Sequence, residues 1–295
     1  MAIDFYCYPS KTGELSVFLE TEQYQDSKEK EYYEYMQREV LAAKEKKKLL
    51  LYHLETDKFL DENGKQVNIF GKIILPRSTI PYVEELLKAI KRHKGISLVN
   101  EMDEESVAYW FDRIPTIRNI QLTTRGELEA DLEVIEEVYS DVFFLKTVRK
   151  GFAGICSILS ADFGFWDSKT KFLMVRDGRY GIGINMVIPN EDTPLMICQA
   201  VKVLQDDFGK REWRAFVIEH ELVSLSRHED EPVVVEEVIF KKAKQKIAEW
   251  KEIMPSCYVV DFFEYTDKDG TIWFDVCECN SIVASGIYYN NNIIV

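Results

Sequence analysis

The spacing of apolar residues near the start of the chain predicts an amphipathic helix. Tyr32, Met36, Val40 and Ala43 recur at every third or fourth position in a stretch that is otherwise mostly charged. Such a period places these side chains on one face of a helix, and Asp26-Ser27 offers short polar side chains that cap a helix N-terminus. We therefore expect a helix that packs on one side only, after a turn-rich N-terminal stretch.

A small α/β lobe is predicted over residues 1–115 because strands and helices alternate there. Its second helix has Pro81 in its first turn, basic residues in its last turn and Gly95 directly after it, which are typical start and stop signals. Short apolar runs predict strands around this helix, and the first two flank a turn at Asn63-Gly64. These runs are residues 49–53, 66–69, 72–76 and 96–99.

The second region, residues 116–295, opens with a helical pattern and continues with an apolar strand that ends in Lys146. The loop after this strand carries two cations and two glycines, Gly151 and Gly154. Backbone N–H groups of such a loop can approach phosphate groups closely. An ordinary basic turn is the alternative interpretation.

Charged and apolar residues alternate over residues 211–218, which predicts a half-buried strand. A turn at Glu219-His220 leads into a returning strand that ends near Arg227. Glu212 and Arg214 are two positions apart, so they share one face and can both point into a cleft. The alternative is a network of ion pairs on a solvent-facing surface.

The C-terminal part predicts a β-hairpin around Asp269-Gly270, a dipeptide typical of two-residue turns. In that register Asp261 lies opposite Glu278, and Asn280 shares their face. Two carboxylates that face each other destabilise a hairpin unless a cation lies between them, and carboxylate and amide oxygens suit Mg²⁺. A register that differs by one or two residues would leave both carboxylates merely solvated.

Composition favours a globular protein without a nucleic-acid partner. The chain has 295 residues, of which 46% are hydrophobic, enough to fill the core of one large domain or two ordinary ones. Its formal net charge is −14, and the one short basic run, residues 44–48, is typical of a solvated helix end. An acidic surface repels phosphate backbones, whereas a nucleotide in a cleft stays compatible with it.

The cysteines predict reduced thiols in a cytoplasmic protein. None of the six forms a C-x-x-C pair, and no cationic leader with an apolar stretch opens the chain. Cys277 and Cys279 share a strand face and could bind a soft metal, but a role in the core is favoured because no second pair stands nearby. No apolar run approaches the roughly 20 residues that span a bilayer, so we expect no membrane partner.

Taken in order, these elements resemble the ATP-grasp superfamily, which includes D-alanine ligase and glutathione synthetase. The resemblance covers residues 105–289: a strand-borne lysine with a glycine loop, a later strand that opens with glutamate, and a terminal D…E-x-N hairpin. Within the superfamily the chain looks most like the clade named for two arginines and one lysine, in which an E-[WFY]-R-x-F segment and an E-x-N…S-G-x-Y ending recur. Here these segments read Glu212-Trp213-Arg214-Ala215-Phe216 and Glu278-Cys279-Asn280…Ser285-Gly286-Ile287-Tyr288.

The resemblance implies an α+β fold in which two antiparallel-sheet subdomains enclose ATP, over residues 116–295, preceded by the small α/β lobe of residues 1–115. It implies ATP and Mg²⁺ as cofactors. It also implies the site residues: Arg113, Lys146, Gly151 and Gly154 at the phosphates, Glu212 at the ribose, backbone groups around Gln199 and Val201 at the adenine, Asp261, Glu278 and Asn280 at the metal, and Arg214 and Arg227 at the acyl-phosphate.

Two departures from the family pattern concern the site. Many ATP-grasp ligases carry an arginine two residues before the metal-binding aspartate, whereas this chain has Val259 there, so Arg214 or Arg227 is expected to substitute. Phe152 also stands in the glycine loop, where a smaller residue would cover phosphates more closely.

The resemblance implies ATP- and Mg²⁺-dependent ligation of a carboxylate to an amine through an acyl-phosphate, with small-molecule or peptide substrates. Arg77, which follows a strand and precedes a helix, is expected either to help bind the acceptor or to lie on the surface. One alternative is a nucleotide-binding assembly factor, similar to a eukaryotic chaperone of translation-initiation-factor assembly. In that case the charged helix at residues 27–48 of this chain would dock a protein partner. A second alternative is a small-molecule kinase.

Overall fold

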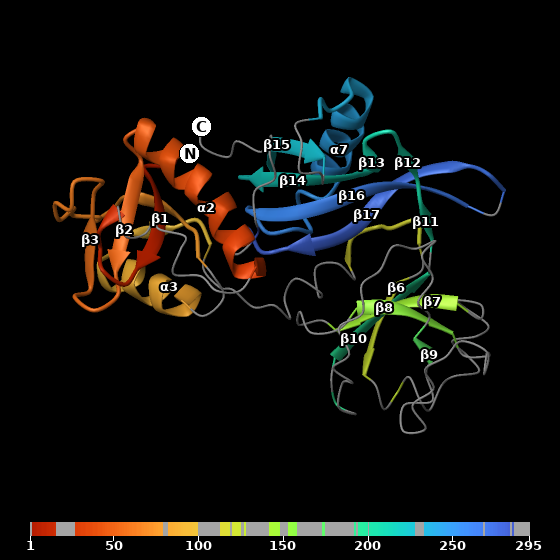
Figure 1. Cartoon of the computed structure of the whole chain (residues 1–295), viewed down its shortest axis with the longest axis horizontal. Helices are drawn as coiled ribbons and strands as arrows, with labels where there is room; N and C mark the ends of the chain where they lie inside the picture. Colours follow the sequence, from red (N-terminus) through yellow and green to blue (C-terminus); the bar gives the residue numbers. More distant parts are fainter. Residues whose placement is uncertain are drawn as a thin grey trace. The chain divides into compact units, whose positions relative to one another are not determined.

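The structure is a computed structural model (Figure 1). The chain divides into two compact units that each combine separate stretches of sequence. The first unit consists of Met1–Asp103, Trp213–Asp261 and Asn280–Val295, and the second of Glu104–Glu212 and Phe262–Cys279. The structure describes residues 2–15, 27–78, 82–99, 113–118, 120–124, 127, 142–147, 153–157, 173–174, 192, 194–199, 201–227, 233–267, 269–283 and 285; for 27–35, 142–147, 153–157, 173–174 and 195 it describes the backbone alone.

The first unit contains a five-stranded sheet in the order β3-β2-β1-β4-β5. β1 is parallel to β2 and to β4, β4 is parallel to β5, and β3 runs antiparallel to β2. Parallel strands in the centre of a sheet are covered on both faces, and β1 and β2 accordingly consist mainly of buried residues. The strands are β1 (Phe5–Ser10), β2 (Leu49–His53), β3 (Lys58–Leu60), β4 (Ile73–Pro76) and β5 (Ile96–Ser97).

Most strands predicted for this sheet are confirmed. β2, β4 and β5 correspond to the apolar runs at 49–53, 72–76 and 96–99. The strand predicted at residues 66–69 is wrong, because β3 pairs with β2 in its place and Gln66 forms only an isolated bridge with Leu60. β1 lies in a stretch for which the sequence predicts turns.

Both predicted helices of this region are present, and the described residues of their predicted faces are mainly buried, whereas the side chain of Tyr32 lies outside the described residues. α2 (Ser27–Glu45) buries Met36, Val40 and Ala43. α3 (Val83–Arg92) buries Val83, Leu86, Ala89 and Ile90, and Gly95 follows it at a close approach. A Cβ atom at Gly95 would lie only 2.9, 3.0 and 3.1 Å from side-chain atoms of Ile69, Ile74 and Ile90.

The two faces of the sheet contribute to two different cores. Side chains alternate along a strand, so Cys7, Leu50 and Tyr52 pack on the side of α3, together with Phe59 and Ile74. The residues between them face a second core that includes segments from the last third of the chain. That core contains Tyr6, Tyr8, Met36, Val40, Ala43, Leu49, Leu51, Phe216, Ile218, Cys257, Val259, Ile282 and Val283.

In this second core, one face of the N-terminal sheet packs against residues more than one hundred positions away in sequence. Residues 1–115 therefore cover one face of their sheet with α3, whereas the other face is covered jointly by α2 and by these distant residues. The predicted boundary between residues 115 and 116 stays a prediction.

The segments that join the N-terminal sheet in the first unit are strands and one helix. β14 (Glu212–Ile218) and β15 (Glu221–Arg227) form a hairpin, and the φ angles of 52° at Glu219 and 64° at His220 confirm the predicted turn. α7 (Glu237–Glu249) buries Ile239, Ala243 and Ile247. β16 (Tyr258–Thr266) is the sheet neighbour of β14 and continues into the second unit.

The second unit contains an antiparallel five-stranded sheet in the order β6-β10-β7-β8-β9. β17 (Ile272–Asn280) pairs with β16, and β11 (Lys202–Val203) pairs with the end of β16. A two-stranded ribbon of β12 (Gln205–Asp206) and β13 (Gly209–Lys210) lies between β11 and β14 in the chain. The sheet consists of β6 (Ile120–Thr124), β7 (Val142–Thr147), β8 (Ala153–Ser157), β9 (Leu173–Met174) and β10 (Pro194–Gln199).

The described cysteine side chains form no disulfide bonds. They are Cys7, Cys198, Cys257, Cys277 and Cys279. Burial raises the pKa of the Cys7 thiol well above its usual value, which keeps this thiol protonated and unreactive. Within the described part of the chain, no helix is long and apolar enough to cross a membrane.

A polar cluster ties the turn after β2 to the end of α3. The carboxylate of Asp57 accepts hydrogen bonds from Arg92 Nη2 at 2.7 Å and from the Tyr52 hydroxyl at 3.0 Å, and it lies 3.2 Å from His93 Nε2. Chiefly because of the bond from Arg92, the pKa of Asp57 falls from its ordinary value of 3.8 to about 2. The charged carboxylate therefore stabilises the folded state.

We expect Asp57→Asn to lower the melting temperature at neutral pH. A carboxyl group with a depressed pKa in the folded state contributes stability above its unfolded pKa and loses it as the pH falls through the folded pKa. The difference from wild type should therefore be constant above pH 4 and shrink between pH 4 and pH 2, which melting curves over this range measure. Glu55→Gln, an exposed change in the same turn, is the control, and an unchanged difference at pH 2 would contradict the assignment.

Candidate functional site

Arg214 on β14 and Asp261 on β16 form a buried bidentate ion pair. Arg214 Nε donates to Asp261 Oδ1 at 2.7 Å, and Nη2 donates to Oδ2 at 2.6 Å. Arg214 is 7% exposed and Asp261 is 1% exposed. Two parallel charge-assisted hydrogen bonds fix both the distance and the plane of the two groups. The structure thus joins two side chains for which the sequence predicts separate roles.

The burial of Arg214 corrects the prediction of a half-buried strand at residues 211–218. Six of the seven residues of β14 are buried, so both faces of this strand are covered. Alternation of charged and apolar residues normally indicates one solvated face. Here Asp261 neutralises Arg214 and allows it to lie inside the protein. The alternative of a solvent-facing ion-pair network is therefore wrong for Arg214.

Asn280, the last residue of β17, lies at the same carboxylate. Its Nδ2 atom donates to Asp261 Oδ2 at 3.3 Å. Asp261 and Asn280 are thus neighbours, as the hairpin pattern predicts. Together they present a carboxylate and an amide, the hard donor groups that suit Mg²⁺.

The turn of the β16–β17 hairpin is wider than predicted. Asp267 N–H donates to Thr271 O at 3.1 Å, and Gly270 N–H donates to Asp267 O at 3.2 Å, so the strands are closed by Asp267 and Thr271. The Asp267 carboxylate also accepts hydrogen bonds from the N–H groups of Asp269 and Thr271 at 3.0 and 2.8 Å, which stabilises this wider turn. The prediction of a two-residue turn at Asp269-Gly270 is wrong.

The wider turn shifts the register next to it by one residue. The argument from the turn that placed Glu278 opposite Asp261 therefore no longer holds, and the place of Glu278 in the metal site stays a prediction. Within the described part of the chain, no group of three His, Cys, Asp or Glu side chains is arranged to hold a metal ion. Of the hard ligands proposed from sequence, Asp261 and Asn280 are brought together and fit a magnesium ion that has further ligands.

Arg227, the second arginine predicted for catalysis, lies at the end of β15 and is 5% exposed. Its partner on β14 is Trp213, whereas Arg214 pairs with Ser226. Directly opposed residues of an antiparallel pair share one face, and neighbouring residues point to opposite faces. Arg227 and Arg214 therefore project from opposite faces of the sheet at this point. The role of Arg227 beside Arg214 stays a prediction.

The residues predicted for phosphate binding are described in part. Lys146 lies on β7, opposite Met196 of β10 and Ala153 of β8. Gly154 is a residue of strand β8 and pairs with Leu145, so its predicted position in a loop is wrong. Gly151, like most of that loop, lies outside the described residues.

The remaining residues predicted for nucleotide binding lie at the ends of strands or outside them. Gln199 is the last residue of β10 and is half-buried, as is Val201 shortly after it. Glu212 opens β14 and is half-buried. Arg113 is exposed in the part of its segment that the structure describes. Their roles at the adenine, ribose and phosphates stay predictions.

Arg118 and Asp275 form a buried cluster in the second unit that the sequence analysis does not identify. Arg118 Nη2 donates to Val276 O at 2.5 Å, and its guanidinium carbon lies 4.7 Å from the ring centroid of Phe263. The Asp275 carboxylate is fully buried and accepts hydrogen bonds from the N–H groups of Ile117 and Arg118 at 3.0 and 3.3 Å. The signal in the sequence is an aspartate among the apolar residues Ile272–Cys277 of β17, which needs a buried partner.

The comparison with known families identifies the C-terminal region. Residues 169–294 match the model of an ATP-grasp domain, family 3 of the clade named for two arginines and one lysine. This match confirms the resemblance to the ATP-grasp superfamily and to that clade. The mixed helix and sheet content agrees with the predicted α+β ATP-grasp fold. No relative was found among curated proteins.

Several solved structures resemble the chain at low sequence identity. The ATP-grasp ligase PsnB complexed with minimal precursor, Mg and ADP is 12% identical with a TM-score of 0.49, over 96% of this chain and 90% of that chain. D-alanyl-alanine synthetase A from Vibrio cholerae is 13% identical with a TM-score of 0.44, over 98% and 92%. D-cycloserine synthetase DcsG is 12% identical with a TM-score of 0.47, over 94% and 91%.

Proposed function

We propose that this chain, whose residues 169–294 match an ATP-grasp domain of the clade named for two arginines and one lysine, is an ATP- and Mg²⁺-dependent carboxylate–amine ligase. One observation carries the proposal. Three side chains from separate strands meet at one buried carboxylate, that of Asp261 on β16. Arg214 of the E-W-R segment and Asn280 of the E-C-N segment both donate hydrogen bonds to it. Stability alone accounts poorly for this arrangement, since replacing a buried ion pair by apolar residues is often neutral or stabilising.

The reaction proposed has two steps. The terminal phosphoryl group of ATP passes to the oxygen of a substrate carboxylate, which gives an acyl-phosphate and ADP. An amine then attacks the carbonyl carbon, loses a proton and expels phosphate, which leaves an amide. Magnesium, when bound, neutralises charge on the terminal phosphates during the first step.

The polar residues of this site supply binding and electrostatic stabilisation. Asp261 and Asn280 would hold the metal ion, with Glu278 as a further ligand. Arg214 would hold Asp261 in place and supply positive charge beside the charge that develops on the acyl-phosphate. Many ATP-grasp ligases carry an arginine two residues before the metal-binding aspartate, and this chain carries Val259 there. Arg214, which pairs with Asp261, would take over the role of that arginine.

The nucleotide would be held by residues of the second unit, among them Arg113. We assign the phosphates to Lys146 and Arg113 with the backbone around Gly151 and Gly154, the ribose hydroxyls to Glu212, and the adenine edge to backbone groups near Gln199 and Val201. Opposite charges beside phosphate oxygens are favourable in a cleft with little water. We place this reaction in the cytoplasm, where thiols stay reduced.

The proposal is tested by incubating the purified protein with ATP, Mg²⁺ and a mixture of the common amino acids or a cell extract. Formation of ADP together with a new amide mass is the expected result. ADP together with a new phosphate ester would indicate a small-molecule kinase instead. Tight ATP binding without any turnover would contradict the ligase proposal and favour an assembly factor that docks a protein partner.

A further inference from the structure

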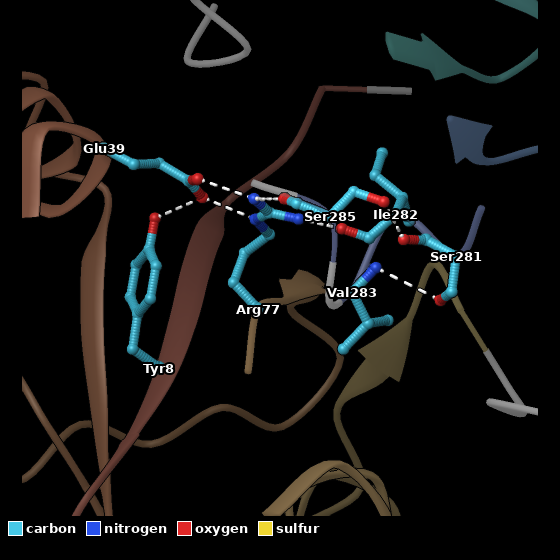
Figure 2. A network of polar contacts seen from close by, with 7 residues as sticks. All are labelled: Tyr8, Glu39, Arg77, Ser281, Ile282, Val283 and Ser285. Atoms are coloured by element: carbon cyan, nitrogen blue, oxygen red, sulfur yellow. Dashed lines mark hydrogen bonds and ion pairs between the residues drawn. The ribbon is translucent and has the colours of Figure 1, made fainter. Parts of the chain in front are cut away.

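A buried ionic network connects the N-terminal sheet to the segment that follows Asn280 (Figure 2). Arg77, directly after β4, donates from Nε to Glu39 Oε1 at 2.6 Å and from Nη2 to Glu39 Oε2 at 2.8 Å. The Tyr8 hydroxyl donates to Glu39 Oε1 at 2.6 Å. The side chains of Arg77 and Glu39 are only 3% and 1% exposed. This corrects the expectation that Arg77 lies on the surface.

The remaining donors of Arg77 hold backbone carbonyl groups. Nη1 donates to Ile282 O, and Nη2 donates to Ser285 O at 2.7 Å. Figure 2 shows the guanidinium group between the Glu39 carboxylate on one side and these two carbonyl groups on the other. One cation thus neutralises a buried carboxylate and fixes two carbonyl groups of a chain segment that begins 205 residues away from it in sequence.

The segment of residues 281–285 is held by further contacts from both sides. Ser78 N–H donates to Val283 O at 2.9 Å. Ser285 Oγ donates to Ser281 O at 2.6 Å, and Val283 N–H donates to Ser281 Oγ at 3.3 Å. Ile282 and Val283 are fully buried in the core that also contains Tyr8. The described residues of this segment are therefore held by Arg77, by Ser78 and by their own hydrogen bonds.

Stability alone does not account for a network of this kind. Removing two charges from water costs several kcal/mol for each ion, and well-packed apolar residues at such a place are often as stable or more so. What apolar residues cannot supply is hydrogen-bond donors for Ile282 O and Ser285 O. The benefit specific to Arg77 is thus a fixed backbone directly after Asn280, whose amide lies 3.3 Å from Asp261 Oδ2.

We propose that Arg77, held by Glu39 and Tyr8, is a positioning residue for Asn280, and through it for the magnesium–nucleotide complex. The catalytic part of this inference rests on the proposed function, whereas the structural part concerns residues 281–285 alone. The proposal also replaces the expectation that Arg77 binds the acceptor substrate, since its donors are directed at Glu39 and two carbonyl groups. Residues that orient a metal ligand without touching the metal typically change metal affinity by about 10–100-fold when they are replaced.

The test uses two variants of the whole protein. Arg77→Lys keeps the charge beside Glu39, but an ammonium group cannot reproduce the planar fork that reaches both the carboxylate and the carbonyl groups. The triple variant Tyr8→Phe, Glu39→Met and Arg77→Met removes the three polar side chains of the network together, so it leaves no buried unpaired charge even if the lysine variant folds poorly. Ile90→Ala, in the core on the side of α3, is the control for general destabilisation.

Two readouts decide the question. We expect the Mg²⁺ concentration needed for ATP binding, measured by calorimetry, to rise about 10-fold in the network variants and to stay unchanged in Ile90→Ala. We also expect backbone hydrogen exchange of residues 281–285 to become faster in the network variants than elsewhere in the first unit.

A folded network variant with wild-type magnesium dependence and wild-type exchange at residues 281–285 would overturn the proposal. Equal changes in Ile90→Ala would overturn it as well, because they would reflect stability alone. If the wild-type protein binds no ATP with Mg²⁺, the proposed function fails, and the exchange rates of residues 281–285 alone decide whether Arg77 positions this segment.

Discussion

Replacing Arg214 by alanine should lower kcat by about 10²–10³-fold and change the KM for ATP less, because the lost donors act on charge that develops during the reaction. The same change should also destabilise the folded protein by about 3–5 kcal/mol, since it leaves the Asp261 carboxylate buried without its counter-charge. Steady-state kinetics and chemical denaturation measure the two effects separately.

Arg214→Lys is the matched control for this prediction. Lysine restores a positive charge beside Asp261, so it should recover most of the lost stability. It cannot place two parallel N–H groups on the carboxylate and further donors on the substrate, so it should recover little of kcat. An Arg214→Ala protein with normal turnover, or a lysine variant that restores kcat and stability to the same degree, would leave Arg214 only a structural role.

Replacing Asp261 by asparagine should abolish the Mg²⁺ dependence of ATP binding and lower the melting temperature even without metal. The first effect follows from the loss of an anionic ligand. The second follows from the Arg214 contact: the neutral amide leaves a buried guanidinium group without its charged partner, at a cost of about 3–5 kcal/mol. Calorimetry with and without Mg²⁺ and thermal melts with chelator measure both.

The sign of this change in stability distinguishes the ion pair of Asp261 with Arg214 from the repulsion between Asp261 and Glu278 that the hairpin pattern predicts. If Asp261 mainly faced Glu278, its neutralisation would relieve repulsion and stabilise the metal-free protein. Glu278→Gln provides the comparison, because it leaves the pair of Arg214 and Asp261 intact and should affect magnesium binding with little loss of stability. A metal-free Asp261→Asn protein at least as stable as wild type would contradict the buried ion pair.

Much of the N-terminal sheet and both of its helices could be predicted because their apolar periods are local. α3 shows this best, since its buried face, its basic last turn and the following Gly95 all agree, whereas Pro81 of the predicted start lies outside the described residues. β1 was missed because Tyr6 and Tyr8 are buried by residues such as Phe216 and Val259 that lie far away in sequence. No local pattern contains that information.

At the candidate site, too, local sequence patterns predict residues, whereas contacts between distant residues cannot be predicted from them. The residues Arg214, Asp261 and Asn280 were predicted from motif order, but the contact between Arg214 and Asp261 was not, since it depends on strands β14 and β16 being neighbours. Arg77 was ambiguous from sequence because its partners are the side chain of Glu39 and the carbonyl groups of Ile282 and Ser285. Every residue has a backbone carbonyl group, so a contact with one cannot be predicted from residue types.

In the hairpin turn, one local signal in the sequence is overridden by another. Asp269-Gly270 suits a two-residue turn, and Gly270 does have a positive φ angle of 82°. The Asp267 side chain, however, accepts two backbone N–H groups and stabilises a wider turn. One residue of difference in the turn changes every cross-strand pair next to it.

The most direct test of the ligase proposal follows oxygen from the carboxylate to phosphate. The protein is incubated with ATP, Mg²⁺ and a mixture of the common amino acids whose carboxyl groups carry ¹⁸O, and the released phosphate is analysed by mass spectrometry. An acyl-phosphate transfers one carboxyl oxygen to the phosphate, so the account predicts one ¹⁸O atom in each phosphate formed with a new amide. ADP accompanied by unlabelled phosphate alone, or an amide formed with release of AMP and pyrophosphate, would contradict it.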